Sequence, residues 1–320
     1  MLRSEETMVS GILAGIFWAI ETIVLSFALT KLSFSDPQSV FLASFVSTFI
    51  HDSFSTLWSF IYNSVKGNLK RILECLKSAD SKFVVIAAIL GGPVGMSGYV
   101  MTINYMGASI GAVASAIYPA IGAILAYFFL KERLHWYRWI FLIITMVAVY
   151  GLSYSSQIEP TNFVLGIIGV LMCSFGWGSD AVILAKSLKS EEIKDEYALL
   201  IRQATSCLTY AIVILPLLNG YTLVKEIIEY NISVVVLIGI AALFATISYL
   251  FYYKAISKIG PSKAMALNVS YSGWAMIFTI IIQLIKKETV VIEPLTIICT
   301  VIVIISSILV AADIKELFKK

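Results

Sequence analysis

Long apolar runs separated by short polar segments follow one another along the whole chain. Each run has roughly the 20 to 25 residues that a helix needs to cross a hydrocarbon core about 30 Å thick. Charged residues and turn residues bound the runs and indicate where each helix ends. The pattern therefore predicts an all-α membrane protein with about ten spans, at residues 8–30, 38–62, 83–102, 107–130, 137–155, 162–186, 197–218, 232–253, 262–285 and 291–312.

The first of these runs, Met8 to Thr30, is too long for the apolar core of a signal peptide. It also carries Trp18 and Glu21 where a cleavage site would need small residues. We therefore expect it to be retained as the first span.

Composition agrees with a lipid-embedded chain. Of its 320 residues, 59% are hydrophobic and only 13% are charged, and the mean hydropathy is +0.90. Soluble domains are nearer a quarter charged, so lipid must be the solvent for most of this chain, and no separate soluble domain fits beside the spans. The net charge of +3 is too small to indicate a nucleic-acid partner.

The basic residues predict an orientation. If the N-terminus is cytoplasmic, only Lys31, Lys225, Lys286 and Lys287 fall outside, Arg202 lies within a span, and the rest of the 23 lysines and arginines lie inside. The positive-inside rule then places both termini in the cytoplasm. We expect the segment from Lys66 to Lys82 to be a basic amphipathic stretch on the inner membrane surface.

The two halves of the chain resemble each other. GILAGIFWAIE (11–21) and GIIGVLMCSFGWGSD (166–180) both end in Trp-x-x-acid. MGAS (106–109) and IGPS (259–262) are each followed by a Tyr eleven residues after the Gly, and a Lys-Glu pair closes each of these helices, at 131–132 and 287–288. Because five spans is an odd number, the second copy must enter the membrane from the other side. The sequence thus predicts two inverted five-helix repeats, 1–156 and 157–320, as in secondary carriers.

Few ionisable residues lie within the predicted spans, and such residues usually line a cavity or pair with one another because their insertion is costly. Away from the ends of the predicted spans, they are Glu21, His51, Asp52, Asp180 and Arg202. We expect Arg202 to neutralise Asp180, in a role that is either structural or gating. His51 and Asp52 can relay a proton, but their position toward the inner end of a span favours a structural or interfacial role.

Aromatic residues share helix faces with these acids. Trp18 precedes Glu21 by three residues, and Trp177 precedes Asp180 by three. Further one-face spacings link Tyr249 with Tyr252 and Tyr271 with Trp274. Rings that converge near a carboxylate at mid-membrane attract an organic cation, and a quaternary ammonium above all. The alternative is that these aromatics serve packing and the membrane interface.

The cysteines and histidines indicate neither a metal site nor a cofactor. Cys75, Cys173, Cys207 and Cys299 stand singly, and the two histidines, His51 and His135, are far apart. A membrane-embedded enzyme would need catalytic residues clustered near one membrane face, and the chain shows none in its sequence. We therefore predict a carrier of a small molecule without cofactors.

Four longer strings carry a family resemblance. They are GGPVGMSGYVMTINYMGASIGAVASAIYPAIGAILAYFFLKERL (91–134), WGSDAVI (177–183), EYALLIRQATSCLTY (196–210) and ISYLFYYKAISKIGPSKAMALNVSYSGW (247–274). In these strings the chain resembles the drug/metabolite transporter superfamily, in its branch of duplicated EamA domains, and within it the bacterial choline permeases of the LicB type. The resemblance implies choline import across the bacterial cytoplasmic membrane by alternating access, with an aromatic pocket at the midplane.

Carried over by motif, the resemblance assigns substrate binding to Trp177, Asp180, Tyr249, Tyr252, Asn268 and Tyr271. The family has Glu where Asp180 stands, and Glu21 has no counterpart in the motifs that carry the resemblance. The substrate can therefore be a cation related to choline, and the ion coupling can differ from that of the family. The sequence leaves transport direction and oligomeric state undetermined, and the alternative function is an exporter of amino acids, metabolites or organic cations. Trp18 and Trp274 join the expected binding set by their spacing, and Glu21, His51, Asp52 and Arg202 form the expected coupling or gating set.

Overall fold

The computed structural model describes residues 2–32, 37–154, 161–287 and 293–312, and within these ranges every regular element is a helix. Two stretches, η1 and η2, are π-helical and interrupt longer helices. In chain order the elements are α1 (Leu2–Leu29), α2 (Pro37–Val65), α3 (Leu69–Cys75), α4 (Ser81–Ile89), η1 (Leu90–Met96), α5 (Ser97–Met106), α6 (Ala108–Leu130), α7 (Trp136–Tyr154), α8 (Phe163–Ser187), α9 (Asp195–Thr209), η2 (Tyr210–Ile214), α10 (Leu215–Leu217), α11 (Tyr221–Tyr230), α12 (Ile232–Ile259), α13 (Pro261–Val269), α14 (Tyr271–Ile285) and α15 (Pro294–Ala311).

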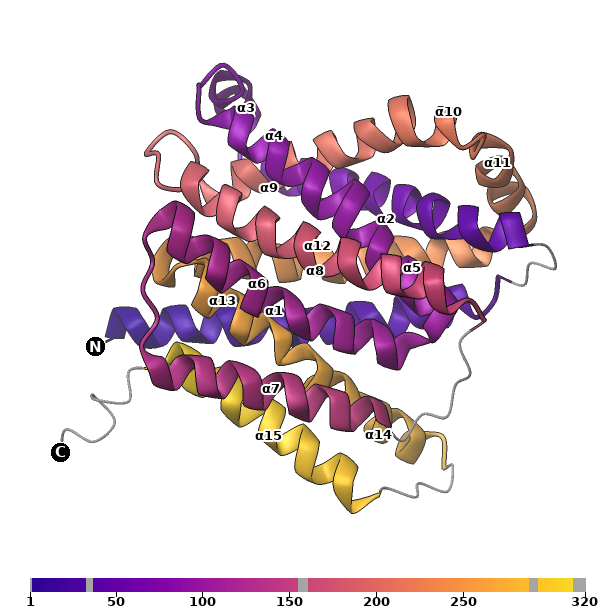
Figure 1. Cartoon of the computed structure of the whole chain (residues 1–320). Helices are drawn as coiled ribbons and strands as arrows, with labels where there is room; N and C mark the ends of the chain where they lie inside the picture. Colours follow the sequence, from indigo (N-terminus) through magenta and orange to yellow (C-terminus); the bar gives the residue numbers. More distant parts are fainter. Residues whose placement is uncertain (1, 33–36, 155–160, 288–292, 313–320) are drawn as a thin grey trace.

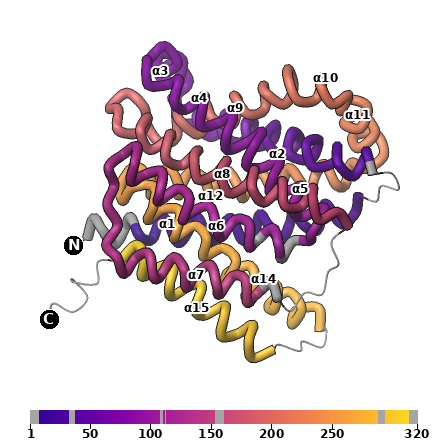
Figure 2. The backbone as a smooth tube through the Cα atoms, viewed as in Figure 1, coloured from indigo at the N-terminus to yellow at the C-terminus, as the bar shows by residue number. Residues whose placement is uncertain are grey.

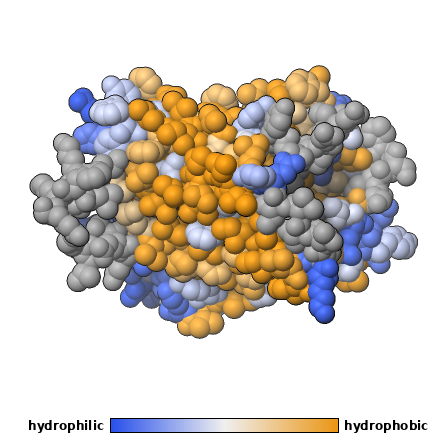
Figure 3. Space-filling view, turned by 90° about the horizontal axis from the view of Figure 1, so that it is seen from below, coloured by the Kyte–Doolittle hydropathy of each residue, from blue (hydrophilic) through white to orange (hydrophobic). Residues whose placement is uncertain are grey.

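The helices confirm an all-α polytopic membrane protein. Nine of the described helical stretches are long and apolar enough to cross a membrane, and a shorter apolar helix, Trp136–Leu152, falls where the fifth span was predicted. Figure 3 shows apolar side chains over the middle of one face and hydrophilic ones gathered toward its two ends. This distribution is that of a bundle whose middle lies in lipid.

Two helices extend beyond the ends of their predicted spans. The helix expected over 83–102 continues to Met106, and the one expected over 232–253 continues to Ile259. Both end only where a glycine takes a positive φ, +86° at Gly107 and +85° at Gly260. A residue with a side chain adopts that conformation with difficulty, so the glycines rather than the polar residues before them end the helices.

The pattern of apolar runs did not predict two helical elements that lie outside the spans. The basic segment from Lys66 to Lys82 contains the short helix α3 and the start of α4. The stretch between the predicted seventh and eighth spans contains α11, which buries Leu223, Val224 and Ile227. Its apolar residues recur at helical spacing, but the helix has only 10 residues, too few to cross a membrane.

Contacts between helices come in matching pairs. α1 packs against α12, and α8 packs against α4, η1 and α5; α6 packs against α8, and α1 packs against α13 and α14. α2 lies against α9, and α7 lies against α15 at one edge of the bundle (Figure 2). Two inverted five-helix repeats would produce this exchange of partners.

Backbone conformations match at the same positions. Gly107 and Gly260 begin α6 and α13 with the same dihedral angles, and Lys131 and Lys287, in the two Lys-Glu pairs, both have φ 57°. The likeness agrees with the repeat, which stays a prediction. Its boundary at 156/157 lies outside the described residues.

The lysine-rich and arginine-rich connections lie together. α1 begins and α15 ends at one end of the bundle, and α3, the α6–α7 connection and the α8–α9 connection lie at the same end (Figure 1). This clustering agrees with the orientation expected from the positive-inside rule, with this end in the cytoplasm, which stays a prediction.

Candidate functional site

Close approach of α8 to the π-helical stretch η1 builds the centre of the bundle. A side-chain carbon placed on Gly91 would overlap the carboxylate of Asp180, and one on Gly95 would overlap the ring of Trp177. Gly91, Gly92 and Pro93 lie within η1, where the regular helical hydrogen bonding is interrupted. These glycines are therefore needed to seat Trp177 and Asp180 against η1.

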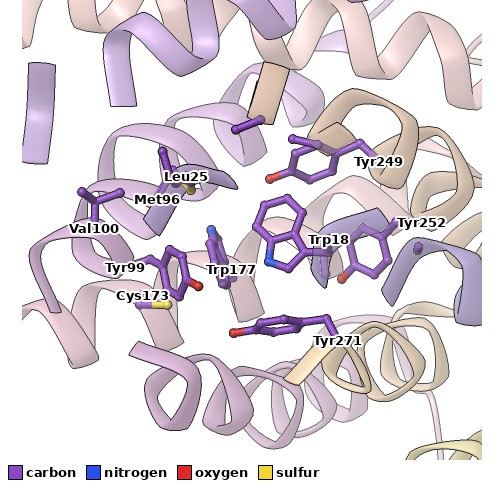
Figure 4. Close-up of a cluster of buried hydrophobic side chains, with 14 of the residues drawn as sticks. Trp18, Leu25, Met96, Tyr99, Val100, Cys173, Trp177, Tyr249, Tyr252 and Tyr271 are labelled. Atoms are coloured by element: carbon purple, nitrogen blue, oxygen red, sulfur yellow. The ribbon is translucent and has the colours of Figure 1, made fainter. Parts of the chain in front are cut away.

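Five aromatic side chains meet at this point, which we call the aromatic cluster: Trp18, Tyr118, Trp177, Tyr249 and Tyr252. Trp177 is at its centre, with ring centroids 5.7 Å from Trp18 and 5.7 Å from Tyr118, both edge to face. Trp18 also meets Tyr249 edge to face, at 5.3 Å. Figure 4 shows the rings of α1, α8 and α12 turned toward one another. The spacings are those of favourable aromatic pairs.

The aromatic cluster encloses a small cavity, whose lining is completed by Asp180 and Asn268. Its volume is about 20 Å³. That is room for about one water molecule. Drug-sized ligands occupy several hundred Å³. The structure therefore shows the site in a closed state, in which the aromatic rings fill most of the space. A larger ligand can bind only if these rings move apart.

A buried ion pair borders the cavity. Arg202 Nη2 lies 3.5 Å from Asp180 Oδ2, and both side chains are almost completely buried. Arg202 Nη1 donates to Gln203 Oε1 at 2.8 Å, and the guanidinium carbon lies 4.7 Å from the ring centroid of Tyr249. Arg202 thus offsets the charge of Asp180, while Asp180 Oδ1 has no hydrogen-bond partner among the described residues.

A second buried polar cluster, which we call the acid–imidazole chain, lies between α1, α2 and α9. It consists of Glu21, His51, Asp52 and Ser206. His51 Nε2 lies 3.6 Å from Glu21 Oε1, and His51 Nδ1 lies 3.1 Å from Asp52 Oδ1. Ser206 donates a hydrogen bond to Asp52 Oδ2. Such groups are costly to bury and usually serve function.

The π-helical stretch connects the two clusters. The Gly91 carbonyl accepts a hydrogen bond from Trp177 Nε1 at 3.1 Å, and the Gly92 carbonyl accepts one from the Tyr210 hydroxyl at 3.2 Å. A side-chain carbon on Gly92 would meet Ser206 and Asp52. A rearrangement of η1 would therefore disturb both clusters at once.

The predicted binding residues are only partly brought together. Trp18, Trp177, Asp180, Tyr249, Tyr252 and Asn268 line the cavity. Tyr271 is buried beside it and shares a hydrogen bond with Ser115 instead. Trp274, one turn along α14, is half-buried and outside the lining, because the chain breaks at Ser270 and redirects the helix. Substrate binding by these two residues stays a prediction.

The predicted coupling residues also separate into two groups. Arg202 pairs with Asp180, whereas Glu21 contacts His51 rather than the cavity. His51 was predicted near the inner end of its span, which is wrong: it lies at the middle of α2 and is buried. The helix continues to Val65, beyond the predicted end of the span at residue 62, so the inner end lies farther from His51 than expected.

Tyr118 is the lining residue that the sequence analysis missed. Its hydroxyl accepts a hydrogen bond from Asn268 Nδ2 at 3.1 Å, and it donates to the Met265 carbonyl at 3.4 Å. The signal was present, since Tyr118 is the Tyr eleven residues after Gly107 that matches Tyr271 in the repeat.

Comparison with known proteins agrees with this arrangement. Residues 7–154 match the EamA-like transporter family. The protein LicB of Haemophilus influenzae (strain ATCC 51907 / DSM 11121 / KW20 / Rd) is 32% identical over 192 residues, which are 60% of this chain and 63% of LicB. The match therefore spans less than two thirds of that relative's length.

A solved crystal structure shares the fold over 99% of both chains, with a TM-score of 0.62 and 15% sequence identity. At that identity the likeness concerns the fold alone. The apolar helices make the chain an all-α polytopic membrane protein, and its residues 7–154 are similar to the EamA-like transporter family.

Proposed function

We propose that the protein is a secondary transporter that imports choline, or a closely related quaternary ammonium ion, across the bacterial cytoplasmic membrane. The observation that carries the proposal is the aromatic cluster closed around a cavity that Asp180 borders. The partial likeness to LicB and the family match support a transporter.

The chemistry of the cavity suits a quaternary ammonium ion. Such an ion carries its charge on methyl groups and donates no strong hydrogen bonds, so ring faces recognise it better than polar atoms do. Trp177, Tyr249 and Tyr252 offer rings from α8 and α12 in the second half of the chain, and Trp18 and Tyr118 add rings from α1 and α6 in the first half. Asp180 adds a diffuse negative potential, because Arg202 offsets most of its charge. A bare carboxylate would instead favour small, strongly hydrated cations.

Movement of the two halves would open the site. The cavity lies where two interrupted helices meet α1, α8 and α12: η1 breaks the third span, and Ser270 separates α13 from α14. Interrupted helices at mid-membrane are typical of carriers built from inverted repeats. We propose that the repeats 1–156 and 157–320 rock about the cavity and expose it to one side at a time.

The membrane potential is sufficient to drive import. A monovalent cation that moves inward gains about 2.3 kcal/mol per 100 mV, which corresponds to roughly fiftyfold accumulation. With both termini in the cytoplasm, as the basic loops indicate, the closed cavity stands between the two solutions.

Calorimetry with the purified protein tests the substrate. We expect saturable binding of choline at micromolar concentrations and much weaker binding of ethanolamine, because an ammonium that keeps its hydrogens loses more hydration in an aromatic site. Binding of arginine or another metabolite in place of choline would contradict the proposed substrate and favour an exporter.

We further propose that the acid–imidazole chain carries a coupling proton. Glu21 Oε1 and His51 Nε2 are buried, face each other at 3.6 Å and form no hydrogen bond within the described structure. One proton shared between them would convert this contact into a charge-assisted hydrogen bond. Glu21 interacts electrostatically with Tyr99 and Tyr249. The charged and titratable groups that interact with Asp52, beside His51, are Arg202, Cys207, Tyr210, Tyr249 and Tyr253.

Replacing Glu21 should therefore change the pH dependence of uptake. In proteoliposomes, uptake of choline by the wild type should rise as the outer solution is made more acidic at constant membrane potential, because the proton enters with the substrate. Glu21→Gln, which keeps the size of the side chain, should remove this rise and leave potential-driven uptake.

The matched control is Glu226→Gln, on the exposed surface of α11, which should keep the pH dependence of the wild type. An identical pH profile in Glu21→Gln would contradict the assignment of the proton to this site.

A further inference from the structure

The polar atoms of the cavity suggest how the uncharged end of a substrate is recognised. Three lining side chains each carry one buried polar atom without a hydrogen-bond partner in the described part of the chain: Trp18 Nε1, Asp180 Oδ1 and Asn268 Oδ1. Buried polar atoms of this kind are rare, because each costs the free energy of its lost hydration. An unpartnered set around one cavity points to a ligand that completes it.

The orientation of the Asn268 amide is fixed by its neighbours. The Tyr118 hydroxyl uses its hydrogen on the Met265 carbonyl, so it can only accept from Asn268, and the amide nitrogen must face it. The amide oxygen is therefore left as an acceptor, at the end of α13 just before the break at Ser270.

Trp18 supplies the complementary donor. Its ring is packed edge to face against Trp177 and Tyr249, which fixes the plane of the indole. Figure 4 shows the indole nitrogen at the side of the ring that faces Trp177 and Tyr271. Trp177 differs, because its own N–H is already donated to the Gly91 carbonyl. Of the two tryptophans, only Trp18 thus has an N–H available to a ligand.

We infer that Trp18 and Asn268 select a substrate that carries a hydroxyl group together with its quaternary ammonium, in the proposed choline site on which this inference rests. A hydroxyl both accepts and donates, so it can accept from Trp18 Nε1 and donate to Asn268 Oδ1. Asp180 Oδ1 then remains beside the positive charge. The methyl groups lie against the rings of Trp177, Tyr249 and Tyr252.

Other end groups fit less well. A carboxylate accepts only, so it leaves Asn268 Oδ1 without a donor and is repelled by Asp180. An alkyl end satisfies neither Trp18 nor Asn268 and leaves both polar groups buried and unpaired. A site built to bind a hydroxyl strongly rejects an analogue that lacks it, for the same reason.

Calorimetry with two matched ligands tests the inference. Propyltrimethylammonium has the shape of choline with a methyl group in place of the hydroxyl. The wild type should bind choline about tenfold or more tightly than this analogue. In Trp18→Phe, which keeps an aromatic ring, and in Asn268→Leu, which keeps the volume, the ratio should fall to about two or less, mainly because choline binds more weakly.

Trp58→Phe is the control. It removes an indole N–H that is donated to the Gly239 carbonyl, away from the cavity, and it should keep the wild-type ratio. Equal binding of both ligands by the wild type, or an unchanged ratio in both cavity variants, would overturn the inference while the quaternary ammonium site stands. Failure of both ligands to bind the folded wild type would overturn the proposed function and this inference with it.

Discussion

Trp177→Ala should abolish measurable choline binding. Trp177 contacts the rings of Trp18 and Tyr118 in the cluster and the ring of Tyr99 outside it, at centroid distances of 5.1 to 5.7 Å. A desolvated ring face contributes about 2 kcal/mol to binding of a quaternary ammonium, which corresponds to roughly 30-fold in affinity. The truncation also removes the edges that hold the neighbouring rings. We therefore expect a loss of about 100-fold or more in calorimetry.

Two further variants make this prediction specific. Trp177→Phe keeps a ring but loses the hydrogen bond to the Gly91 carbonyl, so it should bind choline with an intermediate affinity. Trp136→Ala removes an exposed tryptophan at the start of α7 and should bind as the wild type does. Because a buried Trp→Ala change costs about 3 to 5 kcal/mol of stability, thermal unfolding must show that the variant is folded. Unchanged affinity in folded Trp177→Ala would contradict the cavity as the binding site.

Replacing one partner of the ion pair between Asp180 and Arg202 should destabilise the fold more than replacing both partners by apolar residues. Asp180→Leu leaves Arg202 buried without its partner, and Arg202→Met leaves Asp180 in the same position. Loss of one partner of a buried ion pair typically costs about 3 to 5 kcal/mol, whereas apolar replacement of both is often neutral. The double variant Asp180→Leu/Arg202→Met should therefore unfold at a higher temperature than either single variant.

Choline binding separates the structural role from the functional one. The double variant should recover stability but not affinity, because the diffuse negative charge beside the cavity is lost with Asp180. Lys225→Met, which removes one partner of the exposed Lys225–Glu229 pair on α11, should change neither property. Strictly additive losses of stability in the double variant would show that the two side chains are not coupled.

The spans and most of the cavity lining follow from local sequence. Apolar runs of fixed length predict spans because the bilayer sets that length. Residues three apart lie on the same face of a helix whatever surrounds the helix. Spacing alone therefore places Trp177 beside Asp180 and Tyr249 beside Tyr252. The resemblance to a transporter family then placed the pairs in one pocket, and the structure brings them together around one cavity.

The remaining features depend on packing between distant segments. No spacing rule joins Glu21 to His51, because their contact depends on how α1 lies against α2. The break at Ser270 decides that Asn268 lines the cavity and that Trp274 does not, and Ser270 has no strong helix-breaking character. By contrast, Gly91-Gly92-Pro93 is a local signal for the interruption at η1 that the apolar pattern concealed.

Uptake of choline into proteoliposomes under an inside-negative potential tests the central claim most directly. We expect the wild type to concentrate labelled choline inside the vesicles, and we expect Trp177→Ala, reconstituted in the same amount, not to exceed protein-free vesicles. Equal uptake by both proteins would place the transport pathway away from the aromatic cluster. A wild type that accumulates no choline at any imposed potential would contradict choline import itself.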